Sequence, residues 1–491
     1  MKLVYQVEDR PTPGKLVVFA IQQLLAIMAA TLVVPVIIGN GMAPSAALFG
    51  AGIGTIVYLL FTKFKSPVFL GSSFAFLGSM AAAFAGASAV ALGYLGLIIG
   101  AVLAGLVYVA IAIAVKYAGV NWLNRLMPPV VIGPTVAIIG LSLAGNAVGD
   151  AQKGGVLKAV TELVIKDGAI ESTVNMVPVA HPLICVLVAL VTLATVIICS
   201  TYGKKMFKLI PFIMGILAGY AVALVFTVIG NLADVDALKV ISFDSFKALW
   251  ADGVKITTFV DFPDFTFLTA FGAFGELSLD YFVMILAAYV PVAFVVFAEH
   301  VADHKNISSI IGRDLLEEPG LSRTLLGDGV GSMAGAFFGG CPNTTYGESV
   351  ACVAITGNAS VFTIIAAALG AILISFLTPF VAFVNSIPAC VMGGVCIALY
   401  GFIAVSGLKM IQKVDLGQNK NLFVVSTILI CGIGGLSLTF GQVTITSIAT
   451  SLIFGILVNL LCKNAKDESP EVTDQPLEKL EEAPEAETKS E

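Results

Sequence analysis

Charge is scarce in this sequence of 491 residues. Asp, Glu, Lys and Arg make up only 12% of it, whereas 58% of the residues are hydrophobic and the mean hydropathy is +0.98. Soluble globular domains carry about a quarter charged residues, so the composition excludes a water-soluble protein, and no nucleic-acid partner is expected. Many windows of about 18 or more residues contain no charge, which is the length that spans a bilayer. We therefore expect an all-α polytopic membrane protein whose first partner is the lipid bilayer.

Metal and redox spacings are also missing. The eight cysteines show no CxxC pattern and no Cys/His spacing, and most of them lie within apolar runs. We expect them to be small hydrophobic core residues, and we expect no metal site. An enzyme would need a nucleophile–base pair or a metal cluster, and the intramembrane residues supply neither. The chain is therefore not expected to be an enzyme, and no catalytic residue is assigned.

Long apolar runs recur along the whole chain. Three weaker runs, at 67–84, 325–340 and 344–356, are rich in Gly or interrupted by Gly, Ser, Thr and Asn. Together with the clear runs they give about fourteen expected membrane crossings. The interruptions at 148–180 and 231–275 are expected to be soluble loops. The clear runs are 16–38, 46–62, 88–115, 129–147, 182–200, 207–229, 281–302, 360–384, 388–406, 421–438 and 443–462.

In the short loops, lysine and arginine follow every second segment. If the segments alternate in direction, all of these residues fall on one side, which the positive-inside rule makes the cytoplasm. Both termini are then cytoplasmic, including residues 1–15, and the two long loops lie outside. The first apolar run has spanning length and no cleavage-type site, so no cleaved signal peptide is expected. The residues counted are Arg10, Lys15, Lys63, Lys65, Lys116, Arg125, Lys204, Lys205, Lys208, Lys305, Arg313, Arg323, Lys409, Lys413, Lys420, Lys463 and Lys466.

The last part of the chain, residues 463–491, is acidic and rich in Pro and Glu. It contains almost nothing to bury, so we expect a disordered, solvated tail on the cytoplasmic side. This tail supplies most of the net charge of −6.

The two halves of the chain echo each other. VVFA occurs at 17–20 and again at 295–298, and PPVVIG around Gly133 resembles IPACVMG around Gly393. In each half a broken stretch, GSSFAF in the first and NTTYGE in the second, follows two crossings after the VVFA motif. An odd number of segments per half predicts two inverted repeats, at 16–230 and 276–462. Inverted repeats with a discontinuous segment in each half are typical of transporters, with the site between the broken pieces.

Few ionisable residues lie inside the apolar runs. We identify Glu299, His300, Asp303 and His304 near the end of one run and Glu348 in a broken one. Positions four residues apart share a helix face, so two of the acids are expected to line one cavity wall, with Glu348 approaching it. The alternative for each acid is a polar anchor between helices, or, for Asp303, a place close to the charged loop. The histidines are expected to be helix-packing or loop residues, and four groups within one turn cannot converge on one metal ion.

The broken stretches GSSFAFLGS (71–79) and CPNTTYGES (341–349) supply a second kind of chemistry. Their Gly, Ser, Thr and Asn residues suit unwound backbone, which must line a cavity or be buried in protein. Short helices that start there would point their positive ends at a solute. Phe74 and Tyr346 add aromatic faces suited to a flat ring, and ordinary packing is the alternative.

Longer motifs in both halves resemble one transporter family. AEH at 298–300, RDLLEEPGLSRTLLGDGVGS, PNTTYGESVACVAIT at 342–356 and IPACVMGG at 387–394 are similar to the nucleobase–ascorbate transporter family (nucleobase:cation symporter-2). The first half agrees in ATLVVPVIIG, GSSFAF and NWLNRLMPPVVIGPTVAIIGLSLAG. The resemblance covers roughly residues 10–462 and is strongest to the bacterial uracil permeases of the family.

This resemblance implies a fold of about fourteen segments in two inverted repeats of seven. Segments 3 and 10 would each be part strand and part helix, and their short strands would be antiparallel. A core domain would contain residues 16–115 and 281–384, and a gate domain 129–229 and 388–462. The implied assembly is a homodimer through the gate domains, in the bacterial cytoplasmic (inner or plasma) membrane.

The resemblance also implies the site. Two acids would hydrogen-bond the nucleobase, two residues would offer backbone contacts, and two tyrosines would line the pocket. In that order, the implied substrate-binding residues are Glu299, Glu348, Gly347, Phe74, Tyr346 and Tyr400.

The implied function is proton-coupled uracil import by movement of the core against the gate. Burial disfavours the charged form of a carboxyl group, so Glu299 would bind the proton, with Asp303 as its relay. No cofactor is expected beyond the co-transported proton, for which sodium is an alternative. Uracil permeases of the family often carry His at the position of Asp303, and the family's signature stretch usually has Gly at that of Ala351. Glu348, in turn, departs from the Gln of xanthine transporters. A xanthine or purine symporter of the same family is therefore the alternative, and a channel or a membrane-embedded enzyme is a remote one.

Overall fold

The computed structural model describes residues 3–119, 122, 127–166, 169–204, 206–251, 253–412, 414–440 and 443–462. The predicted disordered tail at 463–491 lies outside the described residues. So do five of the lysines and arginines used to predict the orientation of the chain: Arg125, Lys205, Lys413, Lys463 and Lys466.

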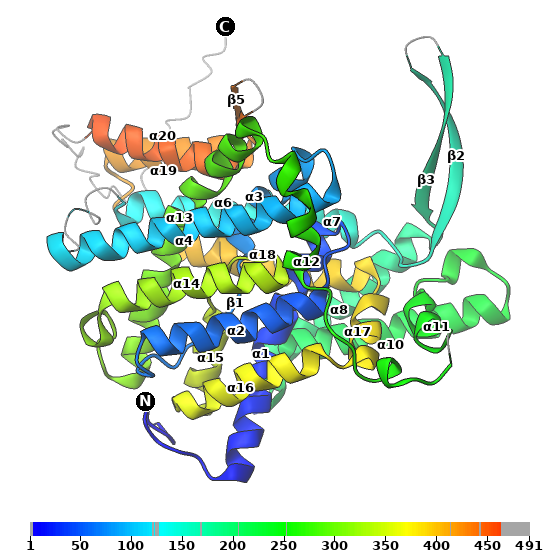
Figure 1. Ribbon diagram of the computed structural model, residues 1–491, viewed down its shortest axis with the longest axis horizontal. Coiled ribbons are helices and arrows are strands. Elements are labelled where there is room, and N and C mark those ends of the chain that lie inside the picture. Colours follow the sequence, from blue (N-terminus) through cyan, green and yellow to red (C-terminus); the bar gives the residue numbers. More distant parts are fainter. Residues whose placement is uncertain are drawn as a thin grey trace, which may run out of the picture.

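The chain is mostly helical, with a few strands between the helices (Figure 1). The elements of the first half are α1 (Pro13–Ile38), α2 (Pro44–Phe61), β1 (Leu70–Ser72), η1 (Phe74–Phe76), α3 (Leu77–Ala85), α4 (Val90–Ala118), α6 (Pro129–Ser142), α7 (Ala144–Asp150), β2 (Leu157–Lys166), β3 (Ala169–Pro178), α8 (Pro182–Tyr202), α9 (Met206–Leu209) and α10 (Pro211–Leu232).

The second half begins with short helices and continues with a long one. Its elements are η2 (Asp236–Leu238), α11 (Asp244–Trp250), η3 (Ile256–Thr258), α12 (Thr266–Ala270), η4 (Phe271–Glu276), α13 (Leu279–Ile311), η5 (Leu316–Gly320), α14 (Leu321–Gly339), β4 (Asn343–Thr345), α15 (Gly347–Thr356), α16 (Val361–Ser375), α17 (Thr378–Ser386), α18 (Ala389–Ile411), α19 (Asn419–Ile433), β5 (Leu438–Phe440), β6 (Val443–Ile445) and α20 (Ser447–Leu461).

Prolines begin several of these helices and glycines end others. Pro182 and Pro211 occupy the first positions of α8 and α10, where the missing N–H costs nothing. Gly312, Gly340 and Gly357 follow the last residues of α13, α14 and α15 in the left-handed conformation. That conformation is easy for glycine and closes a helix.

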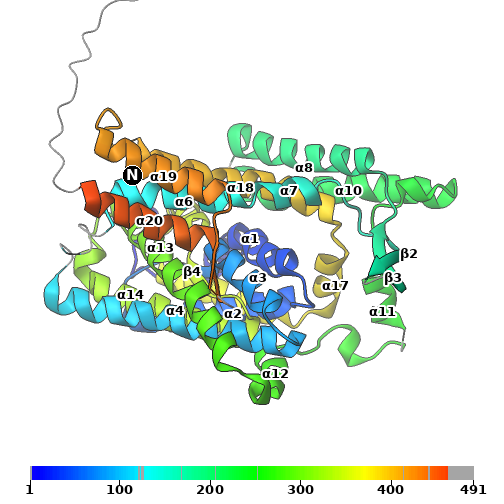
Figure 2. The same cartoon turned by 90° about the horizontal axis from the view of Figure 1, so that it is seen from above.

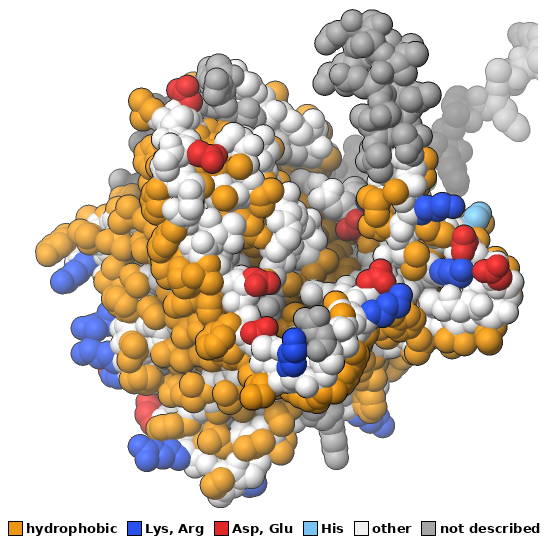
Figure 3. All heavy atoms as spheres, turned by 45° about the vertical axis from the view of Figure 1, so that its right-hand side comes forward, with side chains coloured by type: hydrophobic (Ala, Val, Ile, Leu, Met, Phe, Trp, Pro, Cys, Tyr) orange, Lys and Arg blue, Asp and Glu red, His pale blue; other side chains and the backbone are white. Residues whose placement is uncertain are grey.

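Among the described residues, eight helices are long and apolar enough to cross a membrane. They are α1, α2, α4, α6 together with α7, α8, α10, α13 and α18, and the other apolar helices are shorter. Figure 3 shows hydrophobic side chains over a broad area of one face, as a lipid-facing surface requires. The chain is a multi-pass membrane protein, while the number of fourteen crossings stays a prediction.

The two broken stretches meet in a two-stranded antiparallel sheet. Leu70 of β1 pairs with Thr345 of β4, and Ser72 pairs with Asn343. All residues of both strands are buried. Residues of α2 form hydrogen bonds with some of the polar groups on the outer edges of the strands. Thr55 Oγ1 of α2 accepts from the Leu70 amide across 2.9 Å, and the Asn343 amide donates to the carbonyl of Gly50 across 3.1 Å. Irregular backbone is tolerated at this depth because protein surrounds it.

The helices form two layers with α1 and α3 between them (Figure 2). In one layer α14 packs against α2 and α4. This contact is close, because a Cβ added at Gly50 would lie 2.4 Å from the Gly335 carbonyl oxygen. In the other layer α18 packs against α6 and α8, and α19 against α6 and α20. Small residues at such contacts are typical of helix packing in membranes.

Three predicted boundaries are wrong. The apolar run expected to end at 302 continues as helix to Ile311, because Ile307 and Ile311 extend its buried face. The run 360–384 is split into α16 and α17, since Pro379 in the first turn of α17 disfavours helix before it. The last run begins with strand β6, which pairs with β5.

The region 148–180, expected to be a soluble loop, contains a long hairpin. β2 and β3 pair antiparallel from Leu157 with Pro178 to Lys166 with Ala169. Figure 1 shows this hairpin extending away from the helices, at the same end of the molecule as α11.

Candidate functional site

A cavity of about 390 Å³ lies between the two helix layers. One wall is polar and comes from α13, β4, α15 and η1, whereas the other is largely apolar and comes from α6, α10 and α18. The lining residues on which the following paragraphs depend are Phe74, Glu299, Asp303, Tyr346, Gly347 and Glu348.

Helix α13 contributes two carboxyl groups one turn apart. Glu299 and Asp303 are both partly exposed, and both line the cavity. Oδ2 of Asp303 accepts a hydrogen bond from Thr345 Oγ1 across 2.9 Å. The Glu299 carboxyl group has no hydrogen-bond partner among the described side chains, so its oxygens are available to a solute.

The start of helix α15 faces the same space. Gly347 is its first residue, and a Cβ added there would meet only Asp303 Oδ1, at 3.9 Å. The first N–H groups of a helix have no partner within it, so this backbone can donate to a solute in the cavity. Glu348 lies in the same first turn, where the helix dipole favours a carboxylate. Next to it, Ser349 Oγ accepts from Gln23 of α1 and, across 3.0 Å, from the amide of Phe69.

Two aromatic side chains shape the polar wall. The Tyr346 hydroxyl donates to the Ser72 carbonyl oxygen across 2.7 Å, which joins the two broken stretches. Phe74 packs edge-on against Tyr400 with ring centroids 6.1 Å apart. Tyr400 is buried and is not among the cavity-lining residues. The structure therefore places Tyr400 one layer behind the wall, where it supports Phe74 instead of facing the cavity.

The opposite wall is made of Val136 and Ile139 of α6, Phe212 of α10, and apolar residues of α18 such as Ile403. Toward one end the lining changes to the exposed residues Lys208 and Ser406. A polar wall facing an apolar one suits a flat solute with hydrogen-bonding groups along its edge.

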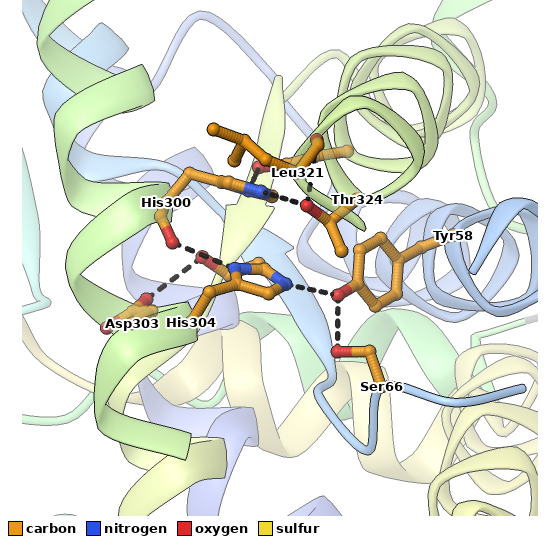
Figure 4. Close-up of polar contacts among 9 residues, drawn as sticks. Tyr58, Ser66, His300, Asp303, His304, Leu321 and Thr324 are labelled. Carbon is orange, nitrogen blue, oxygen red and sulfur yellow. Dashed lines mark hydrogen bonds and ion pairs between the residues drawn. The ribbon is translucent and has the colours of Figure 1, made fainter. Parts of the chain in front are cut away.

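The two histidines of α13 are not among the cavity-lining residues. Figure 4 shows their rings extending from α13 toward Thr324 and Tyr58. His300 Nδ1 lies 2.6 Å from Asp328 Oδ2 of α14, and its Nε2 lies 3.0 Å from Thr324 Oγ1. His304 Nε2 lies 2.7 Å from the Tyr58 hydroxyl of α2. Both rings are completely buried. The sequence predicted that these histidines are either helix-packing or loop residues. Both are helix-packing residues, and neither lies in a loop.

Asp328 is absent from the residues predicted from the sequence. It is almost completely buried in α14 and is held by His300. An acid inside the Gly-rich run 325–340 meets the same criterion that identified Glu348 in its broken run, so this signal was available. Among the described residues, no group of three or more His, Cys, Asp or Glu side chains is arranged to hold a metal ion.

Known families and proteins resemble this chain over most of its length. The profile of a family described as "Permease family" matches residues 14–440. A uracil permease of Bacillus caldolyticus is 40% identical over 94% of this chain and 95% of the relative. Uracil permeases of Bacillus subtilis (strain 168) and Escherichia coli (strain K12) are 36% and 33% identical, over 96% and 93% of this chain and 97% and 93% of the relatives.

Two solved structures share the fold. The transmembrane domain of a cyanobacterium bicarbonate transporter, BicA, has a TM-score of 0.59 and 14% identity over 93% of this chain and 99% of that one. Murine Slc26a9, an anion transporter in the inward-facing state, has a TM-score of 0.60 and 12% identity over 93% and 69%. At these identities the likeness concerns the fold alone.

Proposed function

The chain belongs to the nucleobase–ascorbate transporter family, and on this premise we propose that it imports uracil together with a proton across the bacterial cytoplasmic membrane. The family and the names of the relatives indicate a permease and not an enzyme. The names of the most similar relatives support uracil as the substrate.

One observation carries the proposal. The free carboxyl group of Glu299 and the first turn of α15, with Gly347 and Glu348, face one cavity from two elements. Uracil is a flat, neutral imide with two N–H donors flanked by carbonyl oxygens. The carboxylates accept from its N–H groups, and the helix N-terminus donates to its carbonyls. A site built from such pairs rejects analogues that leave one of its polar groups unpaired.

Phe74 and Tyr346 serve this site through their shape. Tyr346 is held by the Ser72 carbonyl and Phe74 by Tyr400, so both rings have fixed positions beside the cavity. A rigid aromatic wall restricts the solute to a flat ring and costs little conformational entropy when the ring binds. In this account Tyr400 is a positioning residue for Phe74.

Movement of one layer against the other would expose the site in turn to each side of the membrane. The layer with α2, α4, α13 and α14 would be the core, and the layer with α6, α8, α10 and α18–α20 the gate. The packing of the helices within each layer supports this division. The cavity extends to Lys208 and Ser406, at the end predicted to be cytoplasmic, which is the opening expected of an inward-facing state.

Proton coupling follows from the charge of the solute. A neutral molecule gains nothing from the membrane voltage, so its accumulation needs a coupled ion. Glu299 would take up the proton when the cavity closes around uracil, because a carboxylate without a partner is costly in a dry cavity. Asp303 would relay the proton, since it lies one turn away and lines the same wall. Sodium is the alternative ion, and a homodimer through the gate helices is the proposed assembly.

A xanthine or purine symporter is the second candidate. Asp303 favours it, because the purine branch carries an acid at that position, whereas Glu348 favours uracil. Uptake of labelled uracil by cells expressing the protein, in competition with unlabelled uracil, xanthine and uric acid, separates the two. We expect uracil alone to compete strongly and a proton uncoupler to abolish accumulation. If xanthine competes more strongly than uracil, then xanthine is the substrate. Accumulation that persists in the presence of the uncoupler would exclude proton coupling.

A further inference from the structure

Two stretches of chain cross between the helix layers on the side of the molecule that is predicted to be outside. The first runs from α10 through η2, α11, η3, α12 and η4 to α13, and the second runs from α16 through α17 to α18. Helices α10 and α18 belong to the proposed gate, whereas α13 belongs to the proposed core and α16 packs against α2 of that core. Any movement of one layer against the other must therefore bend or shift both crossings.

The two crossings are hydrogen-bonded to each other at their middle. Val260 of the first and Leu377 of the second form an antiparallel bridge. On either side of this pair, each crossing donates one main-chain hydrogen bond to the other. These bonds run from the Asp261 amide to the Phe376 carbonyl oxygen (3.0 Å) and from the Thr378 amide to the Phe259 carbonyl oxygen (3.1 Å). This arrangement is the smallest unit of an antiparallel sheet, so the crossings are not two independent loops.

Side chains and short helices extend this pairing. Thr378 Oγ1 donates to the carbonyl oxygen of Thr257 in η3 across 2.9 Å. The rings of Phe262 and Phe376 pack edge-on, with their centroids 5.6 Å apart. Helix α11 packs against α17, and Figure 2 shows α17 between the two layers. We call this unit, made of α11, η3, α17 and residues 259–262 and 376–377, the outer strap.

On the gate side, both crossings are fixed to helix α10. The amides of Val240 and Ile241 donate to Thr227 Oγ1 of α10 across 3.1 and 3.0 Å. Ser386, the last residue of α17, has its Oγ 2.9 Å from the hydroxyl oxygen of Tyr220, which also belongs to α10. One gate helix therefore holds one end of each crossing.

On the core side, both crossings are fixed to helix α2. The ring of Phe49 on α2 packs edge-on against Phe265 of the first crossing and Phe376 of the second, with centroids 4.8 and 5.8 Å apart. Aromatic pairs in this geometry attract each other beyond their burial. The outer strap is therefore held by α10 at one end and by α2 at the other, and its two chains are paired in between.

We propose that the outer strap is a single hinge between the two layers, that its two chains stay paired throughout the transport cycle, and that Thr378 is the residue that positions them. Two separate loops would let the layers shift and twist in many ways, whereas pairing removes most of this conformational freedom. A few residues at the ends of elements then absorb the change, as in other hinges. The layers move about this connection, and the cavity opens at the opposite end, where Lys208 and Ser406 line it.

This inference rests on the proposed movement of the core against the gate, and it is tested first by locking the pair. Val260 and Leu377 are both exposed. They are flanked by the two hydrogen bonds rather than joined by them, and such a pair has its Cα atoms about 4.5 Å apart, which suits a disulfide. The double variant Val260→Cys/Leu377→Cys can therefore be cross-linked by copper phenanthroline in the full-length protein. The two single variants, treated in the same way, are the controls for the native cysteines.

The readout is the exchange of labelled for unlabelled uracil by proteoliposomes at equal pH, which needs movement of the layers but no net movement of protons. We expect the cross-linked double variant to exchange uracil at the rate of its reduced form. Thr378→Val removes the bond to the Thr257 carbonyl and should slow exchange about two- to tenfold, the factor that one hydrogen bond contributes. Its affinity for uracil should not change. In the cross-linked background the same substitution should have no effect, because the disulfide keeps the chains paired.

A matched control is Ser375→Ala at the end of α16, because this hydroxyl donates to the Ile372 carbonyl of its own helix. This variant should exchange uracil like the wild type. Loss of exchange on cross-linking would overturn the inference, since it shows that the two crossings separate during the cycle. An exchange rate of Thr378→Val equal to that of the wild type, or a slow rate that the cross-link does not restore, would overturn it as well. Failure of the wild type to exchange uracil would instead overturn the proposed function itself.

Discussion

Thr345 Oγ1 donates a hydrogen bond to Asp303 Oδ2 across 2.9 Å, and this contact ties strand β4 to helix α13. Thr345 also pairs with Leu70 of β1, so both broken stretches and α13 meet at one point. Glu299 lies one turn from Asp303 and lines the same cavity. The contact therefore fixes the position of the α13 acids, along the axis of that helix, relative to the start of α15.

Asp303→Asn separates the position of this residue from its charge. The amide oxygen can still accept from Thr345, so uracil exchange should persist, whereas a relay that cannot bind a proton should lose pH-driven accumulation. Thr345→Val is the matched variant, because it removes the donor and keeps the carboxyl group. It should lower uracil affinity more than it changes the pH dependence of uptake. Equal pH-driven accumulation by wild type and Asp303→Asn would exclude the relay.

Gly347→Ala tests the backbone contact at the start of α15. The added methyl group meets no protein atom closer than 3.9 Å, so the fold should tolerate it. The methyl group would occupy the cavity, and one misplaced methyl group costs about 1–3 kcal/mol of binding, or about tenfold or more in affinity. Gly401→Ala on α18 is the control, since nothing lies within 4 Å of its added Cβ. Equal uracil affinities of the two variants, measured by titration of purified protein, would show that uracil does not approach Gly347.

The sequence indicated a membrane transporter and located most of the cavity wall. Glu299, Asp303 and Glu348 stand out because an acid in an apolar run is rare, and Gly347 follows from its place in a broken stretch. Their roles in binding and coupling stay predictions. The end of α13 at Ile311 was missed because Asp303, His304 and Lys305 resemble the start of a polar loop. His304 is buried against Tyr58 of α2, and Asp303 is held by Thr345 of β4, and local sequence does not reveal such partners.

The pairing of elements far apart in the chain was equally hidden. Asp328 is paired with His300 and Tyr58 with His304, across 28 and 246 residues respectively. Neither distance leaves a periodic signal. The β2–β3 hairpin was missed for another reason, since a hydropathy pattern that marks membrane segments says little about structure in the loops between them.

Removing Asp328 should destabilise the protein. Asp328→Ala leaves His300 Nδ1 buried without its partner, and breaking a buried pair costs about 3–5 kcal/mol. Thermal unfolding in detergent should show a clear decrease in the midpoint. The double variant His300→Leu/Asp328→Leu should be less destabilised than the sum of the two single changes, because no polar group then remains unpaired. A midpoint equal to that of the wild type for Asp328→Ala would contradict the pairing.

An ion pair between the N-terminal segment and a residue just after α13 should make stability depend on pH. Arg313, just after α13, donates to Glu8, and this contact lowers the pKa of Glu8 below its usual 4.5. A lowered pKa means that the stabilisation is present at neutral pH and is lost as the pH falls through the folded-state pKa. Both side chains are about half exposed, so the effect should stay below about 1 kcal/mol and weaken in salt. Glu8→Gln should lower the unfolding midpoint slightly at pH 7, and it should have no effect in acid. If Glu8→Gln lowered the unfolding midpoint more in acid than at pH 7, the pH dependence would have the opposite sign and the ion pair would be excluded.

The most direct test of the account is uracil uptake by proteoliposomes that contain wild type, Glu299→Gln or Glu348→Ala under an imposed pH gradient. Losing a hydrogen bond to a charged group costs about 1.5–3 kcal/mol, so each variant should bind uracil about tenfold to a hundredfold more weakly and show no measurable uptake. Glu317→Gln, a change at an exposed acid of η5, should leave uptake unchanged. The account predicts concentrative uptake by the wild type and the control only. Normal uptake by either cavity variant would show that uracil binds elsewhere.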